Sequence, residues 1–94
     1  MKGDRADRCF TCGSFYDIEL HHIFKGKNRK VSDRNGFTVH LCAICHRGRF
    51  GVHGKDGHNI DLYLMETCQR TYEETHTRAE FMALIGKNYL GGEE

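Results

Sequence analysis

The sequence predicts a small α+β domain stapled by a bound metal or by disulfides, and three observations lead to this prediction. Alternating β-forming residues over 14–23 and 37–41 predict two strands. Apolar residues that recur at a spacing of four over 60–76 predict a C-terminal helix. The chain has only 94 residues, a negative mean hydropathy and two Cys-x-x-Cys pairs, so a cross-link is expected to supplement a limited core.

The first half of the chain is expected to fold as a hairpin. Its first strand, 14–23, is expected to bend near Asp17, and the apolar face of that strand is expected to consist of Phe15, Ile18 and Leu20. The polar and basic segment 24–36 predicts a loop that ends in an Asn-Gly turn, a dipeptide that favours hairpins. The second strand, 37–41, places three apolar residues on one face: Phe37, Val39 and Leu41.

The second half of the chain is expected to be helical. A short helix is expected to begin within 42–50, and a glycine-rich loop, 51–59, follows it. The helix over 60–76 has an apolar side formed by residues four positions apart: Ile60, Leu64, Cys68 and Tyr72.

A further helix is predicted from its two ends. Thr77 and Glu80 have the spacing of a capping box, in which each side chain accepts a backbone hydrogen bond at the helix start. Gly86 is expected to end this helix as a C-terminal cap, before a tail at 91–94. Residues 60–90 therefore form the predicted helical extension of a single domain spanning 1–94.

The paired cysteines give the strongest chemical signal. Cys9-x-x-Cys12 and Cys42-x-x-Cys45 supply four thiolates, which suit tetrahedral Zn²⁺. The 29 residues between the pairs are more than the commonest zinc modules have, so the predicted hairpin is expected to lie between them. A redox pair or disulfides are the alternative, and the matched spacing favours structural zinc. Cys68, on the apolar side of a helix, is expected to be a buried hydrophobe.

Charge is distributed unevenly, although the net charge is only +1. Residues 25–55 carry eight basic residues and one acid, Asp33, which gives +7; the remaining residues carry six basic and twelve acidic residues, which gives −6. Such a basic block is typical of surfaces that bind nucleic acid, and a solvated loop is the alternative. The chain has no apolar run long enough for a membrane span and no signal-peptide pattern, which predicts a cytoplasmic protein without a membrane partner.

Six of the seven histidines lie between positions 21 and 58, three of them between the two cysteine pairs and three shortly after the second pair. The segments "CFTCG", "IELHHI" and "LCAICHRGR" together resemble the HNH endonuclease family over residues 9–50. The whole chain is also similar to small HNH proteins of phages and prophages, including recombination-enhancement nucleases. The resemblance implies a ββα-metal (His-Me finger) core over 9–50, with the four-cysteine zinc site as its staple.

The resemblance also implies roles for single residues. His21 and His46 would be ligands of one catalytic divalent cation, either Mg²⁺, Mn²⁺ or another transition metal, and His22 would be the general base. The family's middle asparagine falls at Phe37 here, so the nearby Asn35 is assigned to orient His22. His53, seven residues after His46, is a further candidate, either as a third ligand or as a phosphate donor.

The activity implied is metal-dependent hydrolysis of DNA that leaves 5′-phosphate and 3′-hydroxyl ends. Low sequence specificity is expected, in phage DNA processing or recombination within the cytoplasm of a bacterial host, with a recombination or packaging protein as the partner. One alternative is a noncatalytic zinc ribbon that binds nucleic acid, and another is a structural module of phage assembly. The residues expected to contact DNA are Lys25, Lys27, Arg29, Lys30, Arg47 and Arg49.

Overall fold

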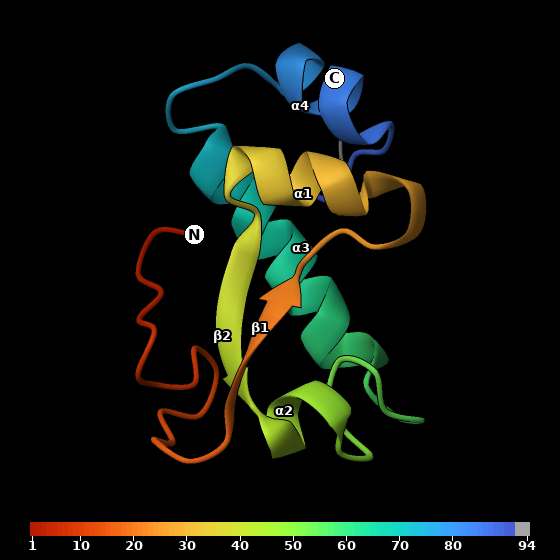
Figure 1. The fold of residues 1–94 in the computed structure, drawn as a ribbon. Coiled ribbons are helices and arrows are strands. Elements are labelled where there is room, and N and C mark those ends of the chain that lie inside the picture. Colours follow the sequence, from red (N-terminus) through yellow and green to blue (C-terminus); the bar gives the residue numbers. More distant parts are fainter. Residues whose placement is uncertain (92–94) are drawn as a thin grey trace.

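Two antiparallel strands lie at the centre of the fold (Figure 1). In a computed structural model that describes residues 1–91, β1 (Ile18–His22) pairs with β2 (Thr38–Cys42) so that Ile18 faces Cys42 and His22 faces Thr38. The predicted bend at Asp17 is present, because this residue has a φ of 51° and separates the strand from the preceding loop. Both predicted strands therefore exist, and the first is shorter than expected.

The apolar face predicted for β1 is wrong. Leu20 is 48 % exposed and Phe15 is 60 % exposed, whereas His21 is only 1 % exposed. The inward face of β1 is instead formed by Glu19 and His21, which lie opposite the buried Leu41 and Val39 of β2. The alternation of β2 is confirmed. The inward residues of both strands lie on the same face of the sheet. The β1 half of this face is therefore polar, formed by Glu19 and His21, and the β2 half is apolar.

The predicted loop 24–36 is largely helical. It contains a 3₁₀ turn, η1 (Gly26–Asn28), and α1 (Arg29–Asn35). The buried Ser32 hydroxyl holds α1 to the end of β1, since it accepts from the Phe24 N–H at 3.1 Å and donates to the Phe24 carbonyl at 2.9 Å. Gly36 does not form the predicted hairpin turn. It has a φ of 69° and caps the C-terminal end of α1, where its N–H donates to the Ser32 carbonyl.

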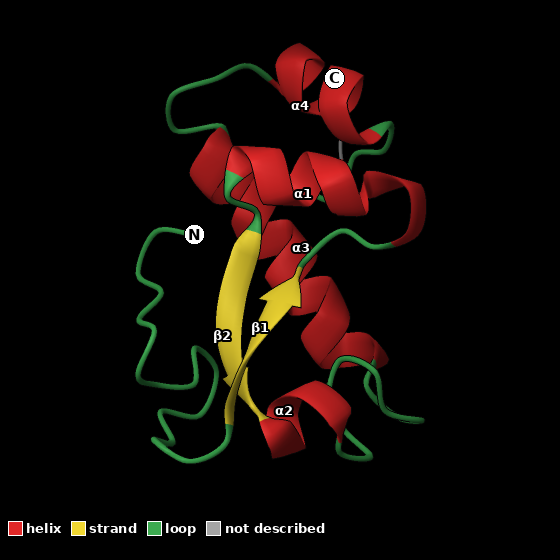
Figure 2. Cartoon of the chain, viewed as in Figure 1, coloured by secondary structure: helices red, strands yellow, loops and turns green. Residues whose placement is uncertain are grey.

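The remaining helices agree with the sequence in type, and α4 also agrees in both of its ends (Figure 2). They are α2 (Ala43–Arg47), α3 (His58–Tyr72) and α4 (Arg78–Ile85). The capping box of α4 is confirmed: the Glu80 N–H donates to the Thr77 hydroxyl, and the Thr77 N–H donates to the Glu80 carboxylate. Gly86 closes this helix in the left-handed conformation. Residues 92–94 of the predicted tail lie outside the described residues.

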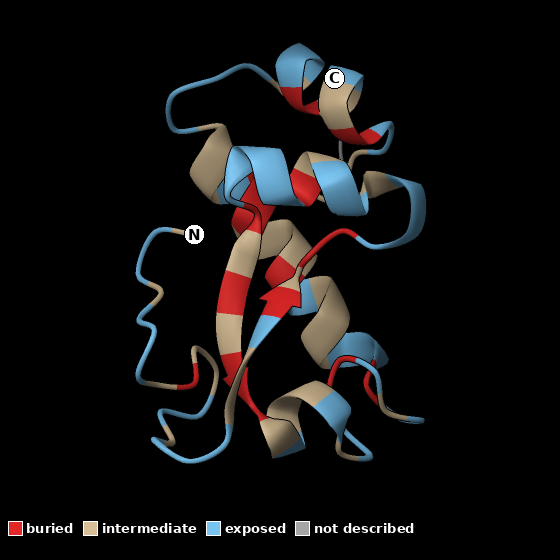
Figure 3. Cartoon of the chain, in the orientation of Figure 1, coloured by how far each residue is buried: buried red, intermediate tan, exposed pale blue. Residues whose placement is uncertain are grey.

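The helices divide between the two ends of the sheet. Figure 1 shows α1 crossing the end where β1 finishes, and α2 at the opposite end. The core joins β2, α3 and α4 through an aromatic cluster in which the Phe24 ring lies 5.7 Å from Phe37 and 5.6 Å from Phe81. In Figure 3 the outer surface of α1 is exposed, with a single buried band at Ser32. None of the helices within residues 1–91 has the length and apolar character needed to cross a membrane.

Candidate metal centres and the adjoining basic hollow

The four predicted zinc ligands meet in one cluster. The thiols of Cys9, Cys12, Cys42 and Cys45 all lie within 4.8 Å of one another. The Cys12 and Cys42 sulfurs are 3.7 Å apart, too far for a disulfide. Tetrahedral zinc with Zn–S bonds of about 2.3 Å separates its sulfurs by about 3.8 Å. The cluster therefore has the dimensions of a structural zinc site, and all five cysteines are free thiols.

Local backbone turns form each half of this cluster. The Gly13 N–H donates to the Cys9 carbonyl at 3.0 Å, and Gly13 has a φ of 78°, which glycine adopts without strain. The second pair begins α2, where the Cys42 sulfur accepts from the Cys45 N–H at 3.4 Å as an N-cap. The Phe10 N–H donates to the His40 carbonyl at 2.8 Å and joins the N-terminal turn to β2.

The protonation of the thiols shows what a metal would do here. Burial disfavours a Cys9 thiolate, but hydrogen bonds from Thr11 and from backbone N–H groups lower the Cys9 pKa to about 6. Burial and the neighbouring thiols raise the pKa of Cys45 to about 12. The first thiolate thus opposes ionisation of another in the same cluster. Because zinc ligands are thiolates, a divalent cation is needed to ionise all four.

A second cluster consists of His21, His46 and His53, whose ligand atoms also lie within 4.8 Å of one another. The His21 ring centroid is 5.2 Å from that of His46 and 5.2 Å from that of His53. The His21 Nε2 atom is buried and has no hydrogen-bond partner within residues 1–91. An unsatisfied buried nitrogen costs about 1–3 kcal/mol, and a metal bound to it would remove this penalty. The three residues therefore fit one transition-metal ion.

Neutral imidazole is the form that binds metals, and burial favours this form at two of the three rings. Burial lowers the pKa of His21 to about 3, with further contributions from the positive charges of Lys25 and the neighbouring histidines. The pKa of His53 is lowered for the same reasons, burial first and then His46 and Lys25. At neutral pH both rings hence present an unprotonated nitrogen.

Glu19 orients His46. Its Oε1 atom lies 2.7 Å from His46 Nδ1, and Arg47 donates to both oxygens, at 2.9 and 2.6 Å. Hydrogen bonds from Arg47 and then His46 lower the Glu19 pKa to about 2, so the carboxylate is ionised and accepts the proton of Nδ1. His46 Nε2 is therefore left to face the metal position, in the arrangement that commonly supports metal-binding histidines.

A compact glycine loop brings His53 to the cluster. Its turns link successive glycines three residues apart, since the N–H of Gly51 donates to Gly48 and that of Gly54 donates to Gly51. The His53 N–H donates to the His46 carbonyl at 3.0 Å. A Cβ on Gly51 would lie 2.6 Å from the Cys45 carbonyl oxygen, and one on Gly54 would collide with the Gly48 carbonyl. Only glycine permits this close approach of the two backbones.

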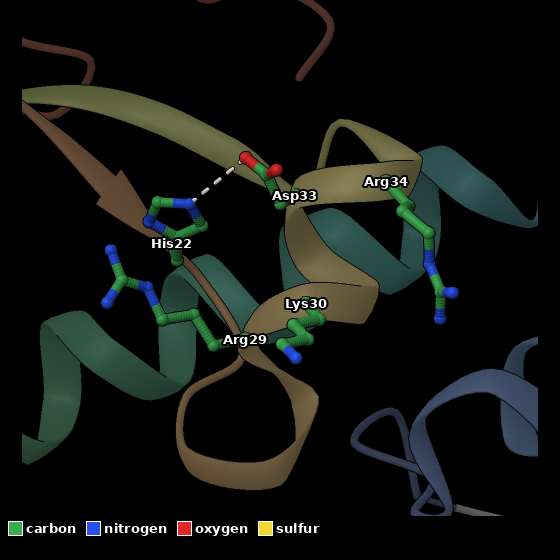
Figure 4. A pocket seen from close by; sticks show the side chains of 5 residues that line it. All are labelled: His22, Arg29, Lys30, Asp33 and Arg34. Carbon is green, nitrogen blue, oxygen red and sulfur yellow. Dashed lines mark hydrogen bonds and ion pairs between the residues drawn. The ribbon is translucent and has the colours of Figure 1, made fainter.

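His22 lies between two hollows on the surface. A hollow of about 350 Å³ is lined by the three clustered histidines and by Leu20, His22, Lys25 and Arg29. A second hollow, of about 550 Å³, is lined by His22, Arg29, Lys30, Asp33 and Arg34 (Figure 4). His22 and Arg29 line both. His21 and His22 point to opposite faces of β1, yet both reach the first hollow because the strand ends at this point.

Asp33, rather than Asn35, contacts His22. His22 Nε2 lies 3.3 Å from the Asp33 carboxylate, as the dashed line in Figure 4 marks. The Asn35 amide instead donates to the Val31 carbonyl at 2.8 Å, on its own helix. The geometry thus gives no support to Asn35 as the residue that orients His22. The signal for Asp33 was present in the sequence, since it is the single acid in the basic block 25–55.

The cationic residues expected to bind DNA fall into two groups. Lys25, Arg47 and Arg49 form ion pairs with Asp61, Glu19 and Asp56, each at 2.6 Å. Lys27, Arg29 and Lys30 are exposed, and no ion pair within residues 1–91 involves them. His40 lies on β2, and its Nδ1 atom contacts the Asp4 carboxylate at 2.6 Å.

The two clusters and the basic hollow are thus formed by β1, α1, β2 and α2 together with the N-terminal turn that holds Cys9 and Cys12 and the glycine loop that holds His53. The cysteine cluster has four donors, whereas the histidine cluster has three and opens into a hollow. Glu19, Asp33 and the glycines of the loop are the supporting residues that the sequence did not reveal as such. Comparison with known proteins finds no match to this chain among family models, curated proteins or solved structures.

Proposed function

We propose that the chain is a metal-dependent DNA endonuclease of the HNH type, with a ββα-metal core formed by β1, β2 and α2 and stapled by zinc. The observation that carries the proposal is the buried, unpartnered His21 Nε2, which faces His46 and His53 next to His22. Three imidazole donors leave coordination positions open, as a catalytic metal requires. An exposed hollow beside them gives a phosphodiester access to these positions.

The chain's own residues would divide the reaction as follows. His21, His46 and His53 would hold a divalent cation, which supplies charge neutralisation of the phosphate and stabilisation of the leaving 3′-oxygen. The Asp33 carboxylate would accept the proton of His22 Nε2, which leaves Nδ1 free to take a proton from the attacking water. Lys25 and Arg29, on the rim of the same hollow, would orient the substrate phosphate.

Plasmid cleavage tests this proposal. Zinc-loaded protein is incubated with supercoiled plasmid and added Mg²⁺, Mn²⁺, Ni²⁺ or no second metal, and nicked and linear forms are quantified. Cleavage is expected only with an added metal, and His22→Ala is expected to reduce the rate by about 10²–10⁴-fold, the usual contribution of a general base. His58→Ala, an exposed histidine at the start of α3, is the matched control and is expected to cut normally.

Circular dichroism and zinc content establish that each variant is folded. Undiminished cleavage by folded His22→Ala would contradict the assignment of the base. DNA binding without cleavage in every metal would favour the second candidate, a noncatalytic zinc ribbon that binds nucleic acid. The four-donor cysteine cluster and the exposed basic residues of α1 support this second candidate. The phage setting, the recombination or packaging partner and the cytoplasmic location are part of the same proposal and rest on the family resemblance.

A further inference from the structure

The hollow formed by α1 is chemically unlike the histidine hollow that it adjoins. Its lining includes three cations from one face of α1: Arg29, Lys30 and Arg34. In Figure 4, Arg29 lies alongside His22, and Arg34 extends from the far end of the helix. The cations therefore form a row that begins at the histidine hollow and leads away from it.

The charges of this row are not compensated by the protein. No ion pair within residues 1–91 involves Arg29, Lys30 or Arg34, whereas the two arginines near α2 each contact a carboxylate at 2.6 Å. Lys30 and Arg34 are four residues apart on the helix, a spacing at which like charges destabilise it by a few tenths of a kcal/mol. Asp33, the acid on this face, contacts His22 instead. The row is thus available to an anionic ligand.

We propose that Arg29, Lys30 and Arg34 bind successive backbone phosphates of the DNA strand on one side of the cleaved bond. The five-residue separation of Arg29 and Arg34 corresponds to about 7.5 Å along the helix axis. Successive phosphates of one strand are separated by about 3.4 Å along the duplex axis and by a longer distance along the winding strand, so the row is long enough to contact neighbouring phosphates. Arg47 and Arg49, which are held by Glu19 and Asp56, make no comparable contribution. This inference rests on the proposed function for the position of the cleaved bond.

A matched pair of double variants tests the proposal. Lys30→Ala with Arg34→Ala and Arg47→Ala with Arg49→Ala each remove two positive charges, so any general effect of net charge is equal. Binding to a fluorescent DNA duplex is measured by anisotropy over about 50–300 mM salt, with zinc-loaded protein and no second metal. The α1 double variant is expected to reduce the slope of log K against log salt by about 1.8, which is about 0.9 for each lost phosphate contact.

The Arg47→Ala, Arg49→Ala variant is expected to change this slope by less than about 0.5. It also leaves the Glu19 and Asp56 carboxylates unpaired, which would weaken DNA binding and so makes the comparison a stricter test of the proposal. Equal slope changes in the two double variants, or no change in the α1 variant, would overturn it. Tighter α1-dependent binding of an RNA duplex of equal length would overturn the assignment to DNA. If wild-type protein binds through α1 but cuts no plasmid, the nuclease proposal fails alone; if it cuts and the two slopes change equally, the α1 proposal fails alone.

Discussion

The two metal clusters are similar in size and opposite in design. In each, all ligand atoms lie within 4.8 Å of one another. The cysteine cluster is assembled from two local turns and has four donors, which complete a tetrahedron. The histidine cluster takes one ring each from β1, α2 and the glycine loop, and it has three donors beside an open hollow.

Under the proposed function, this difference would separate a site that stabilises the fold from a site that can bind a substrate. A complete tetrahedron of thiolates leaves no position for a substrate, so its binding energy goes into folding. An incomplete set of neutral rings leaves positions open, but it also leaves a buried nitrogen unsatisfied until metal binds. The cysteine cluster is therefore expected to govern stability, and the histidine cluster is expected to reduce stability when it is empty.

Removal of one zinc ligand should have the largest effect. Cys42→Ser is expected to lose zinc and with it the cooperative unfolding transition, because zinc binding to such sites is worth about 10 kcal/mol or more. Cys68→Ala is the matched control, since Cys68 is equally buried and outside the cluster. It should retain one zinc per chain. The measurements are metal analysis and thermal denaturation, and a cooperatively folded, zinc-free Cys42→Ser protein would contradict the proposed role.

His21→Leu should have opposite effects on stability in the absence and in the presence of the second metal. Without a second metal the variant is expected to be more stable than wild type by about 1 kcal/mol, because the unsatisfied Nε2 is gone. Saturating Mn²⁺ or Ni²⁺ is expected to stabilise only the wild type and so reverse this order. Denaturant titrations with and without the metal measure both effects. A variant that is less stable in both conditions would show that His21 serves the core alone.

Asp33→Ala should act on rate without acting on either metal. The rate of plasmid cleavage is expected to fall about 10–100-fold, a part of the general-base contribution. Asp33→Asn keeps an acceptor oxygen and should recover part of the rate. Since both variants remove a negative charge from the basic hollow, DNA should bind at least as tightly as before. Weakened DNA binding, or a loss of zinc, would argue against a role in positioning His22.

Gly54→Ala should act on the second metal and leave zinc in place. A methyl group there meets the Gly48 carbonyl, so the loop must shift and move His53 away from the other two rings. The affinity for the second metal is expected to fall about tenfold, and zinc should stay bound. Gly86→Ala, which strains the cap of α4 far from either cluster, controls for general destabilisation. Isothermal titration with Mn²⁺ distinguishes the two, and equal losses in both variants would refute the specific effect.

The sequence predicted the cysteine cluster better than the histidine cluster for a physical reason. Cys-x-x-Cys is a local turn, so spacing alone brings its thiols together. The histidine cluster depends on which face of β1 points inward, and Leu20 suggested the wrong face. A site that binds metal needs polar residues on the inner side, where the apolar pattern does not apply. His21 and His46 were identified through the family resemblance, whereas their partner Glu19 was not.

The error at 24–36 had a similar origin. Its abundant charge and its Asn-Gly pair resemble a loop and a hairpin turn, yet one buried serine is enough to anchor a helix there. Because that helix was missed, Asp33 could not be placed beside His22. The helices of the C-terminal half were predicted correctly in type, since their caps and apolar spacing are local signals.

The cysteine cluster also lies at the two ends of the segment that carries α1. Once Cys12 and Cys42 share a metal, this segment is a closed loop whose entropy changes slowly with length, by about 0.6 kcal/mol for each doubling. Within this segment Ser32 ties α1 to Phe24, and the Asn28 amide ties the start of the helix to the Ile85 carbonyl at 3.0 Å. We therefore expect that the exposed residues of α1 can be replaced, or the helix lengthened, without a change in the cysteine cluster or in the three clustered histidines.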